Sequence, residues 1–536
     1  MLIFKSATPP STPSEPIDVV LEAANDIDEI YLIDARFRLV ARGFGKLITT
    51  VHPGVYKLKV RAGEQVVEEY IVLHPGDSPV RKRLAEVPFA TAAPLAYTTK
   101  SHPHHIEAAC VGSTEEHVSL GNGSWIFVMT RQWTPPTTSV VSQARQPDRH
   151  PAAGLHLMPA DGRGETTSIG DVDLSTSSVT DLTSDAWAAC NIQVNPGLYL
   201  LSVDLPSGRR IQQTIVAAPE WQTQVFLLPR LFPHETAPAP DLLNAAVLMH
   251  RGKGFDPDRR EDRLCEIARH SLMSRRAVVR DEIERMLQSK LENPMLGLFG
   301  AHMLLSPLHT PAGTGDRTHE LLRHVVDSLR ELMIIQHPDV EALALSLSGE
   351  THNQYRFEAP PMLRQSWGQI IDATNQNPML VPEESLSERV SEQLWGPSCW
   401  MVWERSSTTV EESAVPWLET NVGCAIDTAL KATLRKFSRS GGITPDATLA
   451  ALAPATIPAP GSTSPAERVP AAPAVADGLN LIPTDWQEYP ETLRQILTDG
   501  EERKRLAHVS GLPRGKVDRY IAQLQSQFPP PAPQTG

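Results

Sequence analysis

"VHPGVYKLKV" (Val51–Val60) and "VNPGLYLLSV" (Val194–Val203) are nearly the same phrase, written twice in one chain. In both, a Pro-Gly pair precedes a tyrosine and a run with alternating large apolar residues. Proline fixes φ and glycine accepts a positive φ, so we expect a type II turn at each Pro-Gly pair. Alternation with a period of two indicates a half-buried strand. Each phrase therefore predicts a turn that leads into a β-strand.

The similarity continues past each phrase. A short turn at "RAGE" leads to "QVVEEYIVL", and "DLPSG" leads to "RRIQQTIVA". Two alternating runs joined by a glycine-containing turn predict a β-hairpin. Upstream, "EIYLIDARFRLVARGFG" predicts two further strands, and "SWIFVMTRQW" and "AAGLHLMPADGR" hold similar places before the second copy. We therefore expect two antiparallel β-sandwich modules, at residues 17–95 and 118–232.

The PG-x-Y-x-[LV]-x-V hairpin resembles the small PEGA-like and carboxypeptidase-regulatory-like β-sandwich domains, over residues 17–85 and 118–230. The resemblance implies structural or ligand-presenting modules and points away from catalysis. The alternative is that Pro-Gly hairpins recur in unrelated β-sandwiches. Both interpretations give the same fold class.

From about Asp241 the apolar period changes to three and four residues, which predicts helices. In "VVRDEIERMLQSKLENP", Ile283, Met286, Leu287 and Leu291 fall on one face with Val279. The pair Asn293–Pro294 reads as an N-cap and first helical position before the nearly all-apolar "MLGLFGAHMLLS". A helix without a polar face is expected to be buried among others.

Residues 361–435 are expected to continue as helix. Within them, Ser385 and Glu388 have the spacing of a capping box. Trp395, Trp400 and Trp403 follow in "LWGPSCWMVWER". An aromatic stripe is more often core than a ligand cage, so we expect these tryptophans to be buried.

Residues 438–480 are rich in proline, alanine and serine and predict a flexible linker. Beyond it, "RLAHVSGLPRGKVDRYIAQL" resembles a helix-turn-helix within a small helical module at residues 481–528. Ala507, Gly511 and Val517 carry that resemblance, because the alanine lets two helices approach and the glycine makes the turn.

Two interpretations of this module stay open. In the first, it binds DNA through residues 500–528, and Arg514, Lys516 and Arg519 face the groove and the phosphates. In the second, it is a tri-helical protein-interaction module that obeys the same packing constraints. We favour the second, because a single copy offers few DNA contacts and the parent chain is acidic.

The charge and the cysteine content indicate which partners and which cellular compartment to expect. The 49 basic and 63 acidic residues give a net charge of −14, which argues against binding of nucleic acid or an anionic membrane through the overall charge of the protein. The five cysteines are scattered and form no CxxC pair, as expected of a reducing compartment. The start of the chain lacks a signal-peptide apolar core, and no window predicts a membrane span. We expect a cytoplasmic protein without membrane contact.

Short catalytic motifs of the nucleophile-elbow, phosphate-loop, zincin and dinucleotide-binding types are absent from the sequence. The best candidate for a metal site in the sequence is "SHPHHIEAAC". The side chains of His102, His104, His105 and Cys110 are of the kinds that bind zinc. It lacks a second ligand pair and the signature of a caspase-type cysteine. We therefore expect a solvated histidine-rich connector, and no catalytic, cofactor-binding or metal-ligating residues.

The expected fold class is multi-domain, all-β plus all-α. The predicted order begins with a flexible N-terminus (1–16), module 1 (17–95), the connector (96–117) and module 2 (118–232). An α-helical domain (240–437), the linker (438–480), the C-terminal module (481–528) and a proline-rich tail (529–536) follow. This organisation resembles the adaptors of bacterial signalling and conflict systems, which implies a non-enzymatic scaffold that recruits protein partners such as an effector. The alternatives are a transcriptional regulator with an N-terminal sensor, and an enzyme, such as a glycan-active one, that lacks short motifs.

Overall fold

The structure is a computed structural model. It describes residues 15–132, 150–176, 186–274, 280–306, 315–347, 355–405, 421–440 and 486–527, apart from short gaps at 26–27, 63–64, 78, 88–89, 97, 99–100, 165, 171–174, 397, 487 and 489. The N-terminus, most of the predicted linker and the tail lie outside these residues. The described helices include none with the length and apolar character needed to cross a bilayer.

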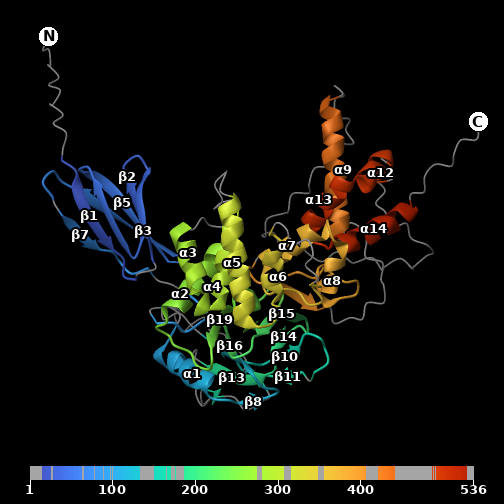
Figure 1. Ribbon diagram of the computed structural model, residues 1–536, viewed down its shortest axis with the longest axis horizontal. Coiled ribbons are helices and arrows are strands. Elements are labelled where there is room, and N and C mark those ends of the chain that lie inside the picture. Colours follow the sequence, from blue (N-terminus) through green and yellow to red (C-terminus); the bar gives the residue numbers. More distant parts are fainter. Residues whose placement is uncertain are drawn as a thin grey trace, which may run out of the picture. The chain divides into compact units, whose positions relative to one another are not determined.

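Two compact units divide the chain. The first comprises residues 1–353, 359–367 and 394–407, and the second comprises residues 354–358, 368–393 and 408–536. Among the described residues, the β-sheets lie in the first unit and the C-terminal helices lie in the second (Figure 1). The predicted combination of β-sheet modules with helical regions is confirmed.

Module 1 contains seven strands, drawn in blue in Figure 1. They are β1 (Ile17–Glu22), β2 (Glu29–Asp34), β3 (Leu39–Phe44), β4 (Lys46–Val51), β5 (Gly54–Ala62), β6 (Gln65–Leu73) and β7 (Val80–Arg83). Their order is β6-β5-β2-β3-β4-β1-β7. Only the pair Phe44 and Lys46 joins β3 to β4, so the order falls into a four-stranded and a three-stranded half around one buried cluster.

Module 2 contains two sheets. The first has the order β11-β10-β14-β15-β20, and the second has the order β12-β13-β9-β16-β19, with β8 beside β13. Their bounds are β8 (Val118–Ser119), β9 (Ser124–Arg131), β10 (Leu155–Pro159), β11 (Thr167–Ser168), β12 (Ser175–Thr176), β13 (Trp187–Val194), β14 (Gly197–Asp204), β15 (Arg210–Ala217), β16 (Trp221–Leu227), β19 (Ala246–Arg251) and β20 (Val402–Arg405). The short strands β17 (Pro229–Arg230) and β18 (Ala239–Pro240) pair separately.

The two modules share one topology. Strands β1 to β7 of module 1 correspond, in chain order, to β9, β10, β11, β13, β14, β15 and β16 of module 2. Every pairing except the single contact of β3 with β4 is kept with its direction: β1 lies antiparallel to β4 and parallel to β7, as β9 lies to β13 and β16. The order β6-β5-β2-β3 is matched by β15-β14-β10-β11, antiparallel throughout. The shared core is therefore antiparallel apart from one parallel pair, β1–β7 in module 1 and β9–β16 in module 2.

The repeated phrase marks the crossover between the two halves of each module. Pro53 follows β4 and leads to β5, and Pro196 follows β13 and leads to β14. Both predicted hairpins, β5–β6 and β14–β15, are confirmed. The predicted type II turns are wrong, because Gly54 and Gly197 begin strands and neither has a positive φ. Here the Pro-Gly pair serves to end one strand and bend the chain toward the other sheet.

The helices of the first unit share a core with module 2. They are α1 (Pro103–Thr114), α2 (Arg260–Met273), α3 (Arg280–Gln288), α4 (Pro294–Leu305), α5 (Gly315–Met333) and α6 (Pro338–Ala344), with short 3-10 turns η2 (Leu242–Asn244) and η3 (Ser289–Leu291). Apolar residues of α2 to α6 and of both sheets form one continuous buried cluster. Asn293 caps α4 by accepting from the Met295 amide, as predicted, and α4 is buried along its length.

Two local expectations are corrected. Leu291, placed on the apolar face before α4, is exposed, because α3 ends at Gln288 and a 3-10 turn rotates Leu291 away from that face. The helix expected throughout residues 361–435 is interrupted by β20. Trp400 and Trp403 are buried as predicted, whereas Trp395 is only partly buried. Trp400 and Trp403 lie before and within a strand that extends the sheet at β15.

The remaining helices are α7 (Arg364–Thr374), η4 (Pro378–Leu380), α8 (Leu386–Val390), α9 (Asn421–Ser440), α12 (Pro490–Thr498), α13 (Gly500–Ser510) and α14 (Arg514–Gln527). All belong to the second unit except the first turn of α7. The predicted histidine-rich connector is largely the helix α1, which packs against β13 and β9.

Candidate interaction surface of the C-terminal unit

The C-terminal unit has a core built from both sides of the predicted linker. α9 precedes the linker, and α12, α13 and α14 follow it (Figure 1). Their apolar faces meet in one buried cluster, whose members are Val422, Ala425, Ile426, Ala429, Leu430, Trp486, Leu493, Ile496, Leu497, Leu506, Ala507, Leu512, Val517, Ile521 and Leu524. The three helices expected to form a module by themselves therefore include α9 as a fourth member of their core.

The turn between α13 and α14 has the local geometry expected from the sequence. Gly511 adopts a left-handed conformation with φ of 70°, and its amide bonds the Ala507 and His508 carbonyls. A residue with a Cβ is disfavoured in that conformation, which explains the glycine. Ala507 and Val517 are buried where the helices approach.

Arg514 and Lys516 lie at the start of α14, and both are engaged. The Arg514 guanidinium contacts the Asp518 carboxylate at 2.9 Å, one turn along the same helix. Lys516 Nζ donates to the Glu388 carbonyl at 3.1 Å and lies 3.4 Å from a Glu392 carboxylate oxygen. Two of the three residues predicted to face nucleic acid therefore contact oxygens of this chain.

Arg519, the third, contacts two carboxylates. Its guanidinium donates to Glu388 and lies 3.4 Å from Glu383. The adjacent Tyr520 hydroxyl donates to Glu392, and burial together with that carboxylate raises the pKa of Tyr520. These contacts bring α14 against one stretch, residues 383–392 ("EESLSERVSE"), which we call the acidic segment.

The acidic segment is held in shape by its own caps. The Ser385 hydroxyl accepts from the Glu388 amide at 3.2 Å, as the predicted capping box requires. The return bond differs from the prediction, because the Glu388 carboxylate accepts from the Glu384 amide at 2.9 Å rather than from that of Ser385. The Glu388 side chain is thus held in place by its own segment, so little conformational entropy is lost when it pairs with Arg519.

A further pair lies at the end of α13. His508 Nδ1 is 2.7 Å from an Asp372 carboxylate oxygen, and the Arg514 amide donates to Thr374 Oγ1 at 3.0 Å. The basic face of α13 and α14 is therefore matched by carboxylates from α7 and the acidic segment. Sequence reasoning found the basic residues but missed their counterpart, although four glutamates within ten residues were its visible signal.

A buried serine, histidine and aspartate occur together in the first unit. His302 Nε2 is 2.9 Å from Ser366 Oγ, which donates to Asp339 Oδ1 at 2.6 Å. The serine stands between the other two, whereas a nucleophilic triad places the histidine in the middle so that it can take the serine proton. All three side chains are buried, and their hydrogen bonds link α4 and α6 to the first turn of α7, which belongs to the same unit.

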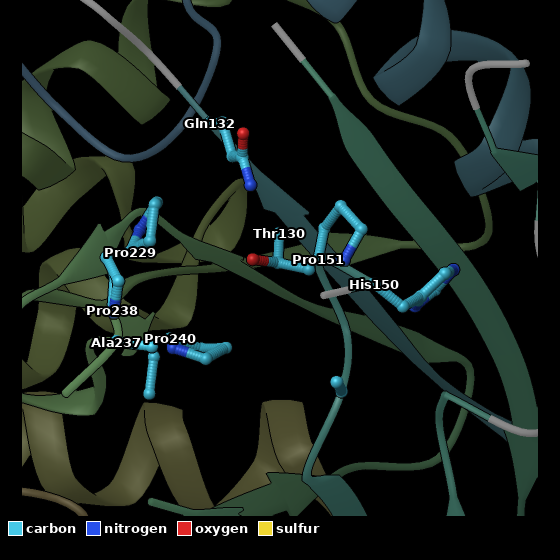
Figure 2. A pocket seen from close by; sticks show the side chains of 10 residues that line it. Thr130, Gln132, His150, Pro151, Pro229, Ala237, Pro238 and Pro240 are labelled. Carbon is cyan, nitrogen blue, oxygen red and sulfur yellow. The ribbon is translucent and has the colours of Figure 1, made fainter. Parts of the chain in front are cut away.

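The described part of the first unit includes one small cavity and one larger cavity. The smaller, of about 40 Å³, lies between Pro229, Pro238 and Pro240 on one side and His150 and Pro151 on the other, with Thr130 between them (Figure 2). It has room for a water molecule or two. The larger, of about 320 Å³, is lined by Thr91, Arg230, Asp241, Arg269 and His270 among others. Arg230 faces Asp241 at 3.7 Å and Arg269 pairs with the buried Glu266, so the charges on its walls largely cancel.

The histidines of the connector begin α1. The rings of His104 and His105 stand 4.2 Å apart, and His105 is buried. Within the described residues, no three histidine, cysteine or acidic side chains are grouped so as to hold a metal ion.

The chain was also compared with known proteins. A scan against protein-family models and a search of curated proteins found no match.

Proposed function

We propose that this protein is a non-enzymatic adaptor that recruits a protein partner through its C-terminal helical unit. The observation that carries the proposal is the contact of α14 with the acidic segment. There, Lys516 and Arg519 bind the side chains and backbone of a glutamate-rich stretch of polypeptide. The chemistry of this face is therefore suited to an acidic segment of a protein.

The partner's recognition element is then a segment whose glutamates are spaced like Glu388 and Glu392, one helical turn apart. It takes the place of the acidic segment on α14. Because Glu388 is buried and Lys516 is mostly buried, the partner has to supply carboxylates that replace those of the acidic segment in these ion pairs. The sandwich modules and the long stretch between α9 and α12 serve to bring that partner near a second ligand, where effective concentration strengthens binding.

A DNA-binding regulator is the second candidate, favoured by the turn at Gly511 between two packed helices. Against it, the three basic residues that would face DNA each contact an oxygen of this chain. Phosphates would have to displace those carboxylates before any base is read. The two candidates therefore predict different ligands for the same face.

The test is affinity capture with the tagged full-length chain from a nuclease-treated lysate of the cells that express it. Wild type is compared with R514A/K516A/R519A. The matched control is R494A/K504A/R505A, which removes the same charge from pairs that lie within α12 and α13.

The proposal expects one protein to be captured by wild type and by the control, and to be lost with the first triple variant. It also expects a synthetic peptide of residues 381–394 to release that protein. If only nucleic acid is captured, and nuclease abolishes all recovery, the adaptor proposal is wrong and the regulator is favoured.

A further inference from the structure

The two sandwich modules have the same core but different edges. In module 2, β15 is the last strand of the shared core, and β20 extends the sheet beyond it with the register Gln212 to Trp403 and Gln213 to Val402. In module 1, β6 holds the place of β15 and is the last strand of its sheet among the described residues.

The hairpin registers fix which residues correspond. Tyr56 pairs with Ile71, and Tyr199 pairs with Ile215. Counting from these pairs, Glu68 and Glu69 occupy the places of Gln212 and Gln213. Tyr70 and Val72 occupy the places of Thr214 and Val216.

The side chains of β15 are buried by other parts of the chain, whereas several of the corresponding side chains of β6 are exposed. In module 2, Thr214 Oγ1 donates to the Pro360 carbonyl at 2.8 Å and Trp403 Nε1 donates to Gln212 at 3.3 Å, so β15 is buried. In module 1, Tyr70 is 67% exposed and Val72 is 52% exposed. What is covered by the chain itself in one module is open in the other.

The second edge strand of module 1 is a poorer site. β7 has four residues, three of them basic, and short charged edge strands resist pairing. β6 has nine residues and carries exposed apolar side chains, namely Val66, Tyr70 and Val72. Its backbone offers a row of hydrogen-bonding groups along its whole length.

We propose that β6 binds an extended strand of a protein partner in which apolar and basic residues alternate. Val67 and Ile71 pack against the core of module 1, so apolar residues of the partner beside them extend that core. On the outer face, Glu68 and Tyr70 favour basic neighbours through cross-strand charge pairing and cation–π contact. β6 contains two glutamates and no basic residue.

The glutamates retain capacity for a second cation. Glu68 lies 2.7 Å from Lys57 and Glu69 lies 2.7 Å from Lys82, yet both carboxylates remain partly exposed. A carboxylate has several lone pairs and accepts more than one donor. This site is on a different part of the chain from α14 and does not rest on the proposed function.

The test uses the full-length chain and three nine-residue peptides, the length of β6. The first alternates valine and lysine, the second alternates valine and glutamate, and the third is the first with a central proline. The proline peptide keeps the charge but cannot complete a strand, so it separates strand addition from general attraction to a chain of charge −14. Binding is followed by fluorescence anisotropy and by hydrogen exchange of residues 65–73.

The protein variants are Y70K/V72K on the proposed face and, as a control of equal charge change, F37K/I48K at exposed apolar positions elsewhere in module 1. All four positions are exposed, so folding is expected to survive. We expect the valine–lysine peptide to protect β6 from exchange and to bind Y70K/V72K about tenfold more weakly. The control variant should bind as wild type does.

The proposal is overturned if the proline or glutamate peptide binds as well as the first, or if no peptide protects β6. It is also overturned if protection of β6 rises with protein concentration alone, because the occupant of the edge is then a second copy of this chain.

Discussion

The Tyr56 hydroxyl donates a 2.7 Å hydrogen bond to the carbonyl of His52, four residues earlier and on the other side of the Pro53 bend. Tyr199 makes the same bond to Asn195 at 2.9 Å. Each tyrosine thus ties the start of one strand to the end of a strand in the facing sheet. The residues that the two modules share in the repeated phrase include those that form this corner, namely the proline at the bend and the tyrosine.

We predict that Tyr56→Phe and Tyr199→Phe each lower the free energy of unfolding of their own module by about 1 kcal/mol, because each removes one hydrogen bond from a nearly buried hydroxyl. Urea denaturation combined with hydrogen exchange at each corner measures the effect. Tyr70→Phe, at an exposed position, is the control and should change neither module. Equal destabilisation by all three variants would contradict the assignment.

The sequence predicted the local elements of this fold well, because alternation and capping are local signals. The hairpins after Pro53 and Pro196, the cap at Asn293 and the buried Trp400 follow from neighbours within a few residues. The position of β20 does not, because its partner β15 lies about two hundred residues earlier. A short apolar run fits a strand or a buried helix equally well, and only the distant partner decides.

Only one side of the candidate site, its basic residues, could be recognised in the sequence, because the other side depends on distant parts of the chain. Arg514, Lys516 and Arg519 were visible as a basic face, but their partners are brought to them by tertiary packing. Similarly, α9 joins the C-terminal core across a long intervening stretch, which no local pattern indicates.

We predict that Arg269→Met destabilises the first unit by about 3–5 kcal/mol, since it leaves a carboxylate buried without its counter-ion. Arg269 donates twice to Glu266, at 2.8 and 2.9 Å, and the Thr91 hydroxyl also donates to the Glu266 carboxylate. Burial alone would raise the pKa of Glu266, but the charge and hydrogen bonds of Arg269 lower it.

The double variant R269M/E266Q is the matched control for that pair. Because it removes the buried charge together with its partner, it should recover much of the loss in a denaturant titration. A double variant as unstable as Arg269→Met would show that packing, and not the charge, is responsible.

Acidification is predicted to weaken the first unit through His302. Burial lowers the pKa of His302 to about 4 from its ordinary value of 6.5, an effect that nearby Asp339 opposes. Between these values the unfolded chain binds a proton that the native protein does not. The free energy of unfolding therefore falls as the pH drops from 6.5 to 4, by about 3 kcal/mol in total.

His302→Gln keeps a donor for Ser366 and removes the titration, so its stability should depend less steeply on pH in this range. The exposed His104→Gln is the control and should retain the wild-type slope. The measurement is the unfolding midpoint in denaturant at several pH values. An unchanged slope for His302→Gln would exclude this histidine as the cause.

The contact between α14 and the acidic segment is predicted to be electrostatic and therefore sensitive to salt. R514A/K516A/R519A should speed hydrogen exchange of residues 383–392, and added salt should do the same in wild type. Because Glu388 is buried, we expect each of the two contacts made by Lys516 and Arg519 to contribute at the upper end of the range for surface pairs, about 1 kcal/mol. R494A/K504A/R505A should leave the acidic segment protected, and faster exchange there in both triple variants would argue for general unfolding of the unit.

Recruitment of protein by the basic face of α14 is decided by titrating the purified captured partner against the full-length chain without nucleic acid. We expect direct binding that the peptide of residues 381–394 competes away, and that R514A/K516A/R519A weakens by about tenfold while R494A/K504A/R505A does not. If the partner binds both triple variants equally, or binds only when duplex DNA is added and with a steep salt dependence, the basic face does not recruit protein.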